Sequence, residues 1–521
     1  MTTALRRCAT SVLGLITAVA AGCAVGPNFH RPAAPPDAGY TVQPLTGAAS
    51  FPGGIEHQKF AMGEDVPFNW WETLGSPEIN SLVQSAFRAN PTVKAAQAAL
   101  RQGQQLVYAQ QGYFFPSVSA DYNFERQKLA GNLTGSNAPG VQGNGTSITA
   151  VQLSTPPYNQ PLYYNFHTAD LTVGFVPDVF GANRRKVESL DAQAQMQRFE
   201  LEATYISLAS NVVAAAIQDA STRAQIQAVK AIISDNEKSF DILSDKHRKG
   251  FATGIDLAVQ QQQLAQARAL LPPLQKQFEL NRDLLRALVG NLPNQDVTET
   301  VELDALKTPS PLPVSLPSKI IRQRPDIRAA EEQLRSANAQ VGVAIAAMLP
   351  QFTITGTMGG TATQFTQMFS SGGPFWTLIG DVSQPLFDGG TLWHTKKAAD
   401  EALRQAAAQY QETVIQGYQN VADTLHAITA DADALDAAVA SERAAKAVLD
   451  LTHRRMQSGY SDALAEFAAS MTYHQAILTR LQQQAVQLGD TAALYQALGG
   501  GWWNREPAVA SAAAKPVVET H

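Results

Sequence analysis

The chain contains two related stretches, Asn90-Pro91-Thr92-Val93-Lys94-Ala95-Ala96 and Arg324-Pro325-Asp326-Ile327-Arg328-Ala329-Ala330. Their prolines are 234 positions apart (325 − 91), and the same offset relates Leu100 to Leu334 and Pro116 to Pro350. An offset that persists across several such positions indicates an internal repeat. The sequence therefore predicts one structural unit that occurs twice.

A second pair of matching stretches has a shorter offset. These are Val176-Pro177-Asp178-Val179-Phe180-Gly181 and Gln384-Pro385-Leu386-Phe387-Asp388-Gly389, which are 208 positions apart (385 − 177). The offset falls by 26 (234 − 208), so the first copy should hold about 26 additional residues between the two matching stretches. Residues from about 129 to 161, rich in Gly, Asn, Ser, Thr and Pro, fit this longer loop, and residues near 359–374 fit the shorter one.

Each copy predicts the order helix, strand, loop, strand, long helix, tight turn and helix. Pro91 and Pro325 begin helices, because proline is tolerated in the first helical turn. In the second long helix, apolar residues from Val414 to Val439 recur in alternating steps of four and three, which is a heptad pattern. The predicted strands lie near 117–127, 165–176, 351–359 and 375–384, and the predicted helical hairpins span 185–290 and 391–498.

Four strands rich in aromatic residues suggest a membrane-spanning sheet that one chain cannot complete. In a bilayer every backbone polar group must be paired, so only a closed barrel is stable, and known barrels have at least about eight strands. Three chains would supply twelve. We therefore predict an α+β membrane protein, a trimeric 12-stranded β-barrel continued by a long α-helical barrel. The alternative is a small soluble β-layer that caps a helical bundle.

The first 22 residues have the pattern of a lipoprotein signal peptide. Arg6 and Arg7 precede an apolar run, and Ala20-Ala21-Gly22 stands directly before Cys23. Small residues mark the cleavage site of a secretory signal, and a cysteine just after them suits a lipoprotein whose new N-terminus is acylated. We predict lipidation of Cys23, and removal of Cys8 would leave no cysteine pair for a disulfide. A plain signal peptide followed by a chance cysteine is the alternative.

The other boundaries follow from the repeat. We predict an N-terminal anchor and equatorial segment (23–75), a first repeat (76–300), a second repeat (310–500) and a disordered tail (504–521). No apolar run of about 18 residues follows Cys23, so no membrane helix is expected. The net charge is −6 and becomes −8 without the signal peptide (37 basic against 45 acidic residues), which disfavours a nucleic-acid partner.

Several motifs together resemble the outer-membrane factor family (TolC-like), specifically the NodT/OprM-type lipoproteins of resistance-nodulation-division (RND) efflux systems. They are Cys23-Ala24-Val25-Gly26-Pro27-Asn28-Phe29, Trp70-Trp71, Asn90-Pro91, Arg324-Pro325-Asp326-Ile327-Arg328-Ala329-Ala330-Glu331 and Gln384-Pro385-Leu386-Phe387-Asp388-Gly389-Gly390. The resemblance implies a homotrimer that acts as the passive outer-membrane channel of a tripartite efflux pump for small molecules. Its partners would be a periplasmic adaptor (membrane fusion) protein and an inner-membrane RND pump. The protein would be lipid-anchored in the cell outer membrane, with its helical part in the periplasm.

The turns of the two predicted hairpins are candidate sites for the partner and the gate. Glycines permit the turns near 250–254 and 459–462. The resemblance implies that such tips contact the adaptor, here through Gly250, Thr253, Asp256, Gly459 and Ser461.

The resemblance also implies that acidic residues on the second tip narrow the pore. Where TolC-like members carry two aspartates, this chain has Ala465 and Ala468, so we predict Asp462 and Glu466 at the constriction. Threefold symmetry would turn either carboxylate into a ring that attracts cations. A helix-capping role is the alternative for these acidic residues.

The sequence does not predict an enzyme. None of the nine histidines lies within five positions of another, so a paired helical metal motif such as H-E-x-x-H is lacking. No cofactor is expected besides the covalent lipid on Cys23. Two other functions stay open: the outer-membrane duct of a type I protein-secretion system and a non-porous structural coiled-coil lipoprotein. The predicted lipid anchor favours efflux over protein secretion.

Overall fold

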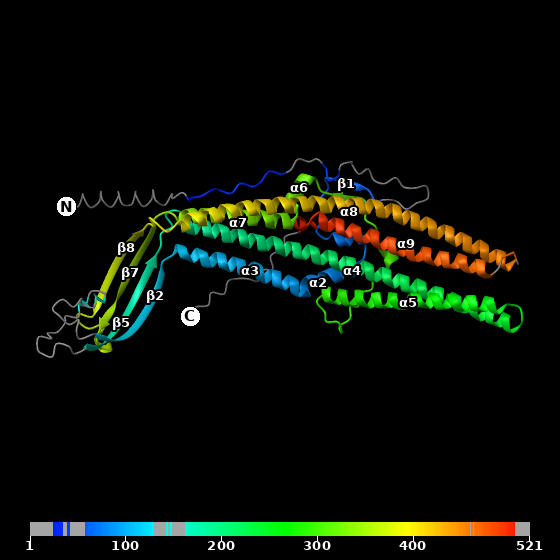
Figure 1. Ribbon diagram of the computed structural model, residues 1–521, viewed down its shortest axis with the longest axis horizontal. Helices are drawn as coiled ribbons and strands as arrows, with labels where there is room; N and C mark the ends of the chain where they lie inside the picture. The colour runs from blue at the N-terminus through cyan, green and yellow to red at the C-terminus, as the bar shows by residue number, and fades with distance from the viewer. Residues whose placement is uncertain are drawn as a thin grey trace. The chain divides into compact units, whose positions relative to one another are not determined.

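The computed structural model of the protein describes two compact units (Figure 1). The described residues are 24–34, 39–41, 58–129, 142–143, 146–147, 162–458, 460–461 and 463–505. The sheet unit comprises the described residues of Met1–His30, Gln102–Ala194 and Gln333–Ala407, and the hairpin unit those of Arg31–Arg101, Gln195–Glu332 and Ala408–His521. Each unit thus takes residues from both predicted repeats. Outside the described residues lie the predicted signal peptide, Cys23, Gly459, Asp462 and the tail after Arg505.

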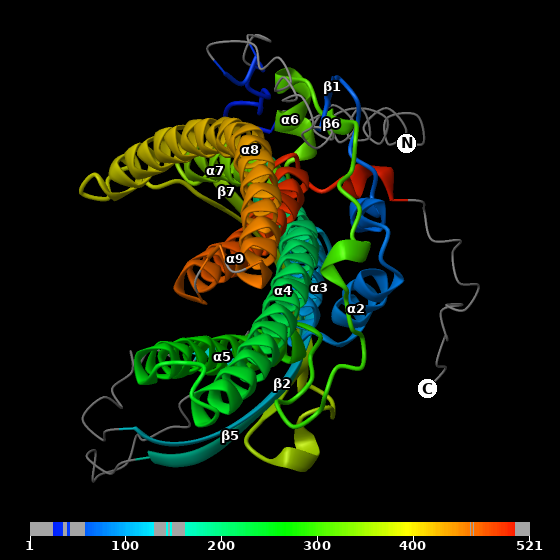
Figure 2. The same cartoon turned by 90° about the vertical axis from the view of Figure 1, so that its right-hand side faces the viewer.

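The sheet unit contains one four-stranded antiparallel sheet, from which its helices extend (Figure 1). Its strands are β2 (Ser117–Leu129), β5 (Leu162–Phe175), β7 (Gln351–Ala362) and β8 (Pro374–Ser383), in the order β2-β5-β7-β8. All four predicted strands are present, with ends that differ from the prediction by at most three residues. β2 and β5 are hydrogen-bonded to each other along their length and curve together (Figure 2). A short pair, β3 (Gln142–Gly143) and β4 (Thr146–Ser147), lies in the predicted long loop.

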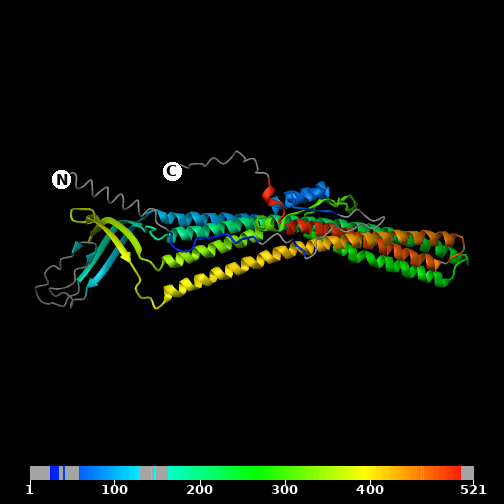
Figure 3. The same cartoon turned by 90° about the horizontal axis from the view of Figure 1, so that it is seen from above.

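Four long helices make the two predicted hairpins. They are α4 (Ala182–Arg248) with α5 (Gly254–Leu288), and α8 (Thr391–Gln457) with α9 (Ala463–Ala497). Within each hairpin the second helix returns alongside the first (Figure 3). The predicted heptad positions Val421, Leu425, Ile428 and Leu435 of α8 are at most 5% exposed. Among the described residues, no helix has both the length and the apolar character needed to cross a membrane.

Shorter elements complete the hairpin unit. Trp70 stacks on Tyr495 with ring centroids 5.1 Å apart, in an apolar core that includes Leu74 and Leu285. The parallel pairing of β1 (Phe60–Met62) with β6 (Leu312–Val314) joins the predicted equatorial segment to the start of the second repeat.

The remaining helices of the described chain, from both units, are η1 (Trp70–Leu74), α2 (Pro77–Ala89), α3 (Pro91–Gln111), η2 (Gly112–Phe114), η4 (Leu303–Ala305), α6 (Pro317–Gln323), α7 (Pro325–Ala346), η5 (Phe365–Gln367) and η6 (Trp502–Asn504).

The structure relates the two copies by offsets of 234 and 209. β2 and β7 begin 234 positions apart (351 − 117), as predicted. The long helices α4 and α8 have 67 residues each, α5 and α9 have 35 each, and both pairs begin 209 positions apart (391 − 182 and 463 − 254). The two copies therefore have long helices of equal length.

The strand registers follow an offset of 209, one more than the 208 positions between the two proline motifs. Ser117 lies opposite Gly174 in the first copy, and in the second copy Gln351 (117 + 234) lies opposite Ser383 (174 + 209). Between these paired residues the first copy is therefore longer by 25 residues, close to the predicted value of about 26. The matched prolines lie in turns after the strands, where one inserted residue is tolerated, whereas a one-residue slip inside a strand would reverse its faces.

Candidate functional site: the two-faced sheet, the N-terminal segment and the hairpin tips

One face of the sheet is exposed and mostly apolar, with Arg126, Lys128, Asn165 and His167 as polar members. Directly opposite residues in neighbouring strands share a face, so Ala120, Leu171, Met358 and Trp376 form one row across the sheet. The same register assigns to this face Val118, Tyr122, Phe124, Val173, Ile354, Leu378 and Val382. The large side chains of this set are 38–77% exposed. We call this surface the apolar face.

The opposite face is mostly polar. Asp121 lies opposite Asp170, and two cross-strand pairs of threonine hydroxyls, Thr168–Thr361 and Thr172–Thr357, are 3.3 and 3.1 Å apart. The same register assigns to this face Ser119, Asn123, Glu125, Thr353, Thr355, Thr377 and Asp381, with Phe166, Phe375 and Ile379 as apolar members. We call this surface the polar face. A sheet with one exposed apolar face and one polar face suits a boundary between an apolar medium and water.

The segment that follows Cys23 is bound to α4 by a buried arginine. Arg185, which is 4% exposed, donates hydrogen bonds to the carbonyl oxygens of Val25 (3.0 Å) and Gly26 (3.2 Å) and to Oδ1 of Asn28 (2.9 Å). Gly26 has a φ of 92°, and a Cβ on it would lie 2.6 Å from the Cα of Gly342. The motif after Cys23 therefore owes its glycine to a close backbone approach.

We predict that Arg185→Met releases this segment. Methionine can fill much of the apolar volume but cannot replace the three hydrogen bonds, so the local stability should fall by about 2 kcal/mol. Hydrogen exchange at the amide of Val25, which donates to the carbonyl of Phe180 (3.1 Å), should then be roughly thirty times faster. Arg184→Met is the matched control, because Arg184 pairs with Asp178. Unchanged exchange in Arg185→Met would contradict the prediction.

At the first hairpin tip, two of the predicted contact residues form a helix cap. Thr253 Oγ1 accepts a hydrogen bond from the amide of Asp256 (3.1 Å), and Asp256 Oδ2 accepts one from the amide of Thr253 (2.9 Å). Hydrogen bonds from the side chain and then the amide of Thr253 lower the pKa of Asp256. Gly250 has a φ of 80°, and the exposed apolar side chains of this tip are Phe251 (81%) and Ile255 (77%). The capping role is thus established for Thr253 and Asp256, and their contact with an adaptor stays a prediction.

At the second tip, Glu466 joins the two helices of its own hairpin. Nδ1 of His453 on α8 lies 2.5 Å from Oε1 of Glu466 in the first turn of α9, and Nε2 of Gln457 lies 2.7 Å from Nε2 of the same histidine. The side chain of Glu466 is 24% exposed. Tyr460, beside Ser461, is 79% exposed. The predicted pore role of Glu466 is not tested by this contact and stays a prediction, and Asp462 lies outside the described residues.

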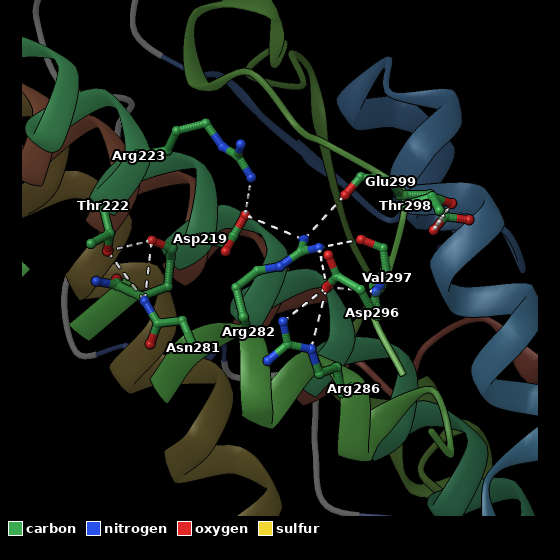
Figure 4. Close-up of polar contacts among 11 residues, drawn as sticks. Asp219, Thr222, Arg223, Asn281, Arg282, Arg286, Asp296, Val297, Thr298 and Glu299 are labelled. Carbon is green, nitrogen blue, oxygen red and sulfur yellow. Dashed lines mark hydrogen bonds and ion pairs between the residues drawn. The ribbon is translucent and has the colours of Figure 1, made fainter. Parts of the chain in front are cut away.

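A buried arginine connects α4, α5 and the segment after α5 (Figure 4). Arg282 on α5 is 6% exposed and lies 3.9 Å from Oδ2 of Asp219 on α4 and 2.9 Å from Oδ1 of Asp296. It also donates hydrogen bonds to the carbonyl oxygens of Val297 and Glu299. Hydrogen bonds from Arg286 and from Arg282 lower the pKa of Asp296 to about 2. This network has the character of a structural clamp, because it joins three parts of one chain.

The two hairpins differ in a polar pair that lies between their helices. In the first hairpin, Nδ2 of Asn281 donates a hydrogen bond to Oγ1 of Thr222 (3.2 Å). The offset of 209 relates these residues to Asp490 and Asp431, so the second hairpin replaces a neutral pair with two carboxyl groups. Burial, followed by the hydrogen bond and repulsion from Asp490, raises the pKa of Asp431 to about 7. One of these carboxyl groups therefore holds a proton well above the usual pH range of aspartate.

Sequence reasoning identified the tips but not Arg185, Asp431 or Asp490. The signal for the aspartates was in the repeat, because alignment at 209 sets them against Thr222 and Asn281. Arg185 has no such signal, since its partners are backbone carbonyls about 160 positions away along the chain.

Comparison with known proteins identifies the family. The family model described as outer membrane efflux protein matches residues 82–291 and 316–500. The chain belongs to the outer membrane efflux protein family. The two matched stretches fall within the predicted repeats, 76–300 and 310–500.

The chain also matches relatives of similar length. The chain is 25% identical to the pyoverdine export outer membrane protein OpmQ of Pseudomonas putida, over 90% of this chain and 95% of the relative. It is 26% identical to the outer membrane protein OprJ of Pseudomonas aeruginosa, over 96% and 97% of the two chains. A solved structure, the CmeC outer membrane channel of Campylobacter jejuni, matches with a TM-score of 0.81 at 21% identity, over 93% of this chain and 96% of that one.

These findings confirm the predicted function and location at the level that they test. The chain is an outer-membrane channel protein of an efflux pump, and the family comparison assigns it to transport. The fold is that of the TolC-like outer membrane channels.

Proposed function

We propose that three copies of this chain form a passive conduit, in which twelve strands close a β-barrel and the hairpins continue it as an α-helical barrel. The observation that carries the proposal is the sheet with one apolar face, one polar face and two edges to which the described chain adds no further strand. Four strands are too few for a barrel, and twelve lie within the known range. The apolar face would contact lipid, and the polar face would line water.

The proposal extends to the anchor and the partners. Cys23 carries a covalent lipid that holds the N-terminus at the outer membrane, while the helices extend into the periplasm. A periplasmic adaptor protein contacts the hairpin tips, at Gly250, Thr253, Asp256, Gly459 and Ser461, and links the conduit to an inner-membrane RND pump. Small molecules pass through the conduit, which needs no cofactor besides the lipid. The names of relatives, such as a toluene efflux pump outer membrane protein of Pseudomonas putida, support a small-molecule cargo.

Reconstitution tests the conduit. Purified protein in detergent should have the mass of three lipidated chains and should give stepwise ion conductance in a planar bilayer. A trimer without conductance would favour the non-porous structural lipoprotein, and a monomer would contradict the proposal itself. The lipid is tested separately, because mass spectrometry of the mature N-terminal peptide should show an acylated Cys23 that is lost in Cys23→Ala. A type I secretion role would be favoured if deletion of the gene stopped the export of a polypeptide and left drug susceptibility unchanged.

We predict that Asp462→Ala with Glu466→Ala changes conduction. If these carboxylates form rings at the constriction, their removal should reduce the preference for cations, and the smaller alanine side chains should widen the opening, so that single-channel conductance rises by about twofold or more. The matched control is Asp433→Ala, an exposed aspartate of α8. His453→Gln separates the two roles of Glu466, because it changes the contact with α8 but keeps the carboxylate. Unchanged conductance and ion preference in the double variant would contradict the prediction.

A further inference from the structure

The two edge strands of the sheet are β2 and β8, and each is paired on one side only within the described chain. The outer side of an edge strand presents unpaired backbone donors and acceptors. In an apolar medium these groups must find partners, at a cost of several kcal/mol for each one left alone. The proposed trimeric conduit therefore requires β8 of one copy to pair with β2 of the next, but the trimer alone does not specify the register.

The internal repeat supplies the missing register. β2 pairs with β5 as β7 pairs with β8, since Ser117–Gly174 and Gln351–Ser383 are equivalent under the offsets of 234 and 209. The remaining contact in the sheet joins the second strand of the first repeat to the first strand of the second repeat, through pairs such as Thr172–Thr357. The contact between two copies joins the second strand of the second repeat to the first strand of the first repeat.

We infer that β8 of one copy and β2 of a second copy pair in the register of β5 and β7, so that the numbers of opposite residues sum to 504. Adding 209 to each residue of β5 and subtracting 234 from its partner in β7 gives these pairs. Those on the polar face are Ser383–Asp121, Asp381–Asn123, Ile379–Glu125 and Thr377–Gln127. The inference rests on the proposed conduit and names the strand contacts between its copies.

The two faces of the sheet give independent support for this register, because they require the numbers of opposite residues to add up to an even number. In the inferred register Val382 lies opposite Tyr122, and both belong to the apolar face. A slip of one residue would place Val382 opposite Asp121 or Asn123 of the polar face. Such a slip exchanges the faces of every strand across the contact, so sums of 503 and 505 are excluded. The sum of 503 is the value that the sequence offset of 208 would have given.

The turns after β5 and β8 support the same contact. After β5, Phe180 packs near Phe352 at the start of β7, with ring centroids 6.4 Å apart. After β8, the corresponding turn exposes Leu386 (93%) and Phe387 (92%). The start of β2, which corresponds to the start of β7, exposes Val118 (63%). Inside the chain, the turn after β5 therefore packs near the start of β7. The equivalent surfaces at the two edges of the sheet, the turn after β8 and the start of β2, are exposed, as expected if they cover each other between two copies.

Cysteine cross-linking tests the register in the full-length protein. Ile379→Cys should form a disulfide between copies with Glu125→Cys, and not with Asn123→Cys or Gln127→Cys. Opposite residues have Cα atoms about 4.5–5.5 Å apart, within the range of a disulfide, whereas a shift of two residues gives about 7–8 Å. Within one chain, residues 379 and 125 lie on opposite edge strands, which are about 14 Å apart across the sheet, and they are also shifted along the strands by about eight residues, so a disulfide reports contact between copies.

We expect covalently linked trimers on denaturing gels for Ile379→Cys with Glu125→Cys, and at most one tenth of that yield for the two shifted pairs. The same preference should recur for Thr377→Cys with Gln127→Cys over Thr377→Cys with Glu125→Cys. Each single-cysteine variant is the matched control, because the natural cysteines are Cys8 and Cys23 alone.

The outcomes separate the register from the conduit. Preferential cross-linking of a shifted pair would overturn the register and leave the trimer intact. A trimer by mass in which no pair cross-links would also overturn the inference, because β2 and β8 would then not be neighbours. A monomer by mass, without cross-links, would contradict the proposed conduit itself.

Discussion

Arg282→Thr is expected to lower the free energy of unfolding by about 3 kcal/mol. The substitution removes a buried guanidinium group and leaves the carboxylate of Asp219, which is 2% exposed, with Arg223 as its remaining ion-pair partner at 3.0 Å. It also removes the donor to the carbonyl oxygens of Val297 and Glu299 (Figure 4). Breaking a buried ion pair from one side typically costs about 3–5 kcal/mol, because the other charge stays buried. Denaturant unfolding of the purified protein measures this loss, with the helix content followed by circular dichroism at about 222 nm.

Arg286→Thr is the matched control for this experiment. Arg286 pairs with Asp283 and Asp296, whose side chains are 52% and 67% exposed, so its loss should cost at most about 1 kcal/mol. A similar loss in Arg282→Thr and Arg286→Thr would show that burial does not set the strength of this network.

The second hairpin suggests a double substitution that should restore the stability lost in Arg282→Thr. The offset of 209 relates Asp219 and Arg282 to Ile428 and Thr491, which are 2% and 0% exposed. The second hairpin therefore uses an uncharged pair at these positions. Asp219→Ile combined with Arg282→Thr copies that pair, and it should recover most of the stability lost in Arg282→Thr, since replacing both charges is less costly than removing one.

The internal repeat made the helices and strands predictable. The strand register was harder to predict, because a difference of one residue in the offset between the copies changes it. Pro177 and Pro385 are 208 positions apart, one fewer than the equivalent strand residues, because these prolines mark the turn after a strand and not the strand itself. The strands carry the correct offset through weaker matches, Phe166 with Phe375 and Val173 with Val382 (both 209). Since β-strand side chains alternate, an error of one residue would have assigned the apolar side chains of one strand to the wrong face.

Contacts between residues distant in sequence were not predictable from pattern. The pairing of β1 with β6 involves three-residue strands about 250 positions apart, too short to show any periodicity. Arg185 binds the N-terminal segment largely through the backbone carbonyls of Val25 and Gly26, which carry no sequence signal. Glu466 was identified by its position near a tip, but its contact with His453 required the relative rotation of α8 and α9, which the sequence does not supply.

Asp431→Asn is expected to remove a pH-dependent destabilisation of the second hairpin. The pKa of Asp431 is raised from 3.8 to about 7, so the folded protein binds this proton more tightly than the unfolded chain does. The sign follows from linkage: between about pH 4 and pH 7 the unfolded chain has released the proton, and each rise in pH then favours unfolding. Because Asp431 is only partly buried, we expect a loss of about 2 kcal/mol across this interval.

Unfolding measured from pH 4 to pH 8 should therefore give two different profiles. The natural protein should lose stability as the pH rises, whereas Asp431→Asn should be flatter, equal at pH 4 and more stable by about 2 kcal/mol at pH 8. Asparagine can donate a hydrogen bond to Asp490 without a proton from solvent, as Asn281 donates one to Thr222 in the first hairpin. Asp433→Asn, an exposed change on the same helix, should keep the slope of the natural protein. Asp296, with a pKa of about 2, contributes stability that is lost only below about pH 4, so it does not mask the effect. Parallel profiles for the natural protein and Asp431→Asn would mean that the two carboxyl groups do not share a proton, and that the difference between the hairpins has no consequence for stability.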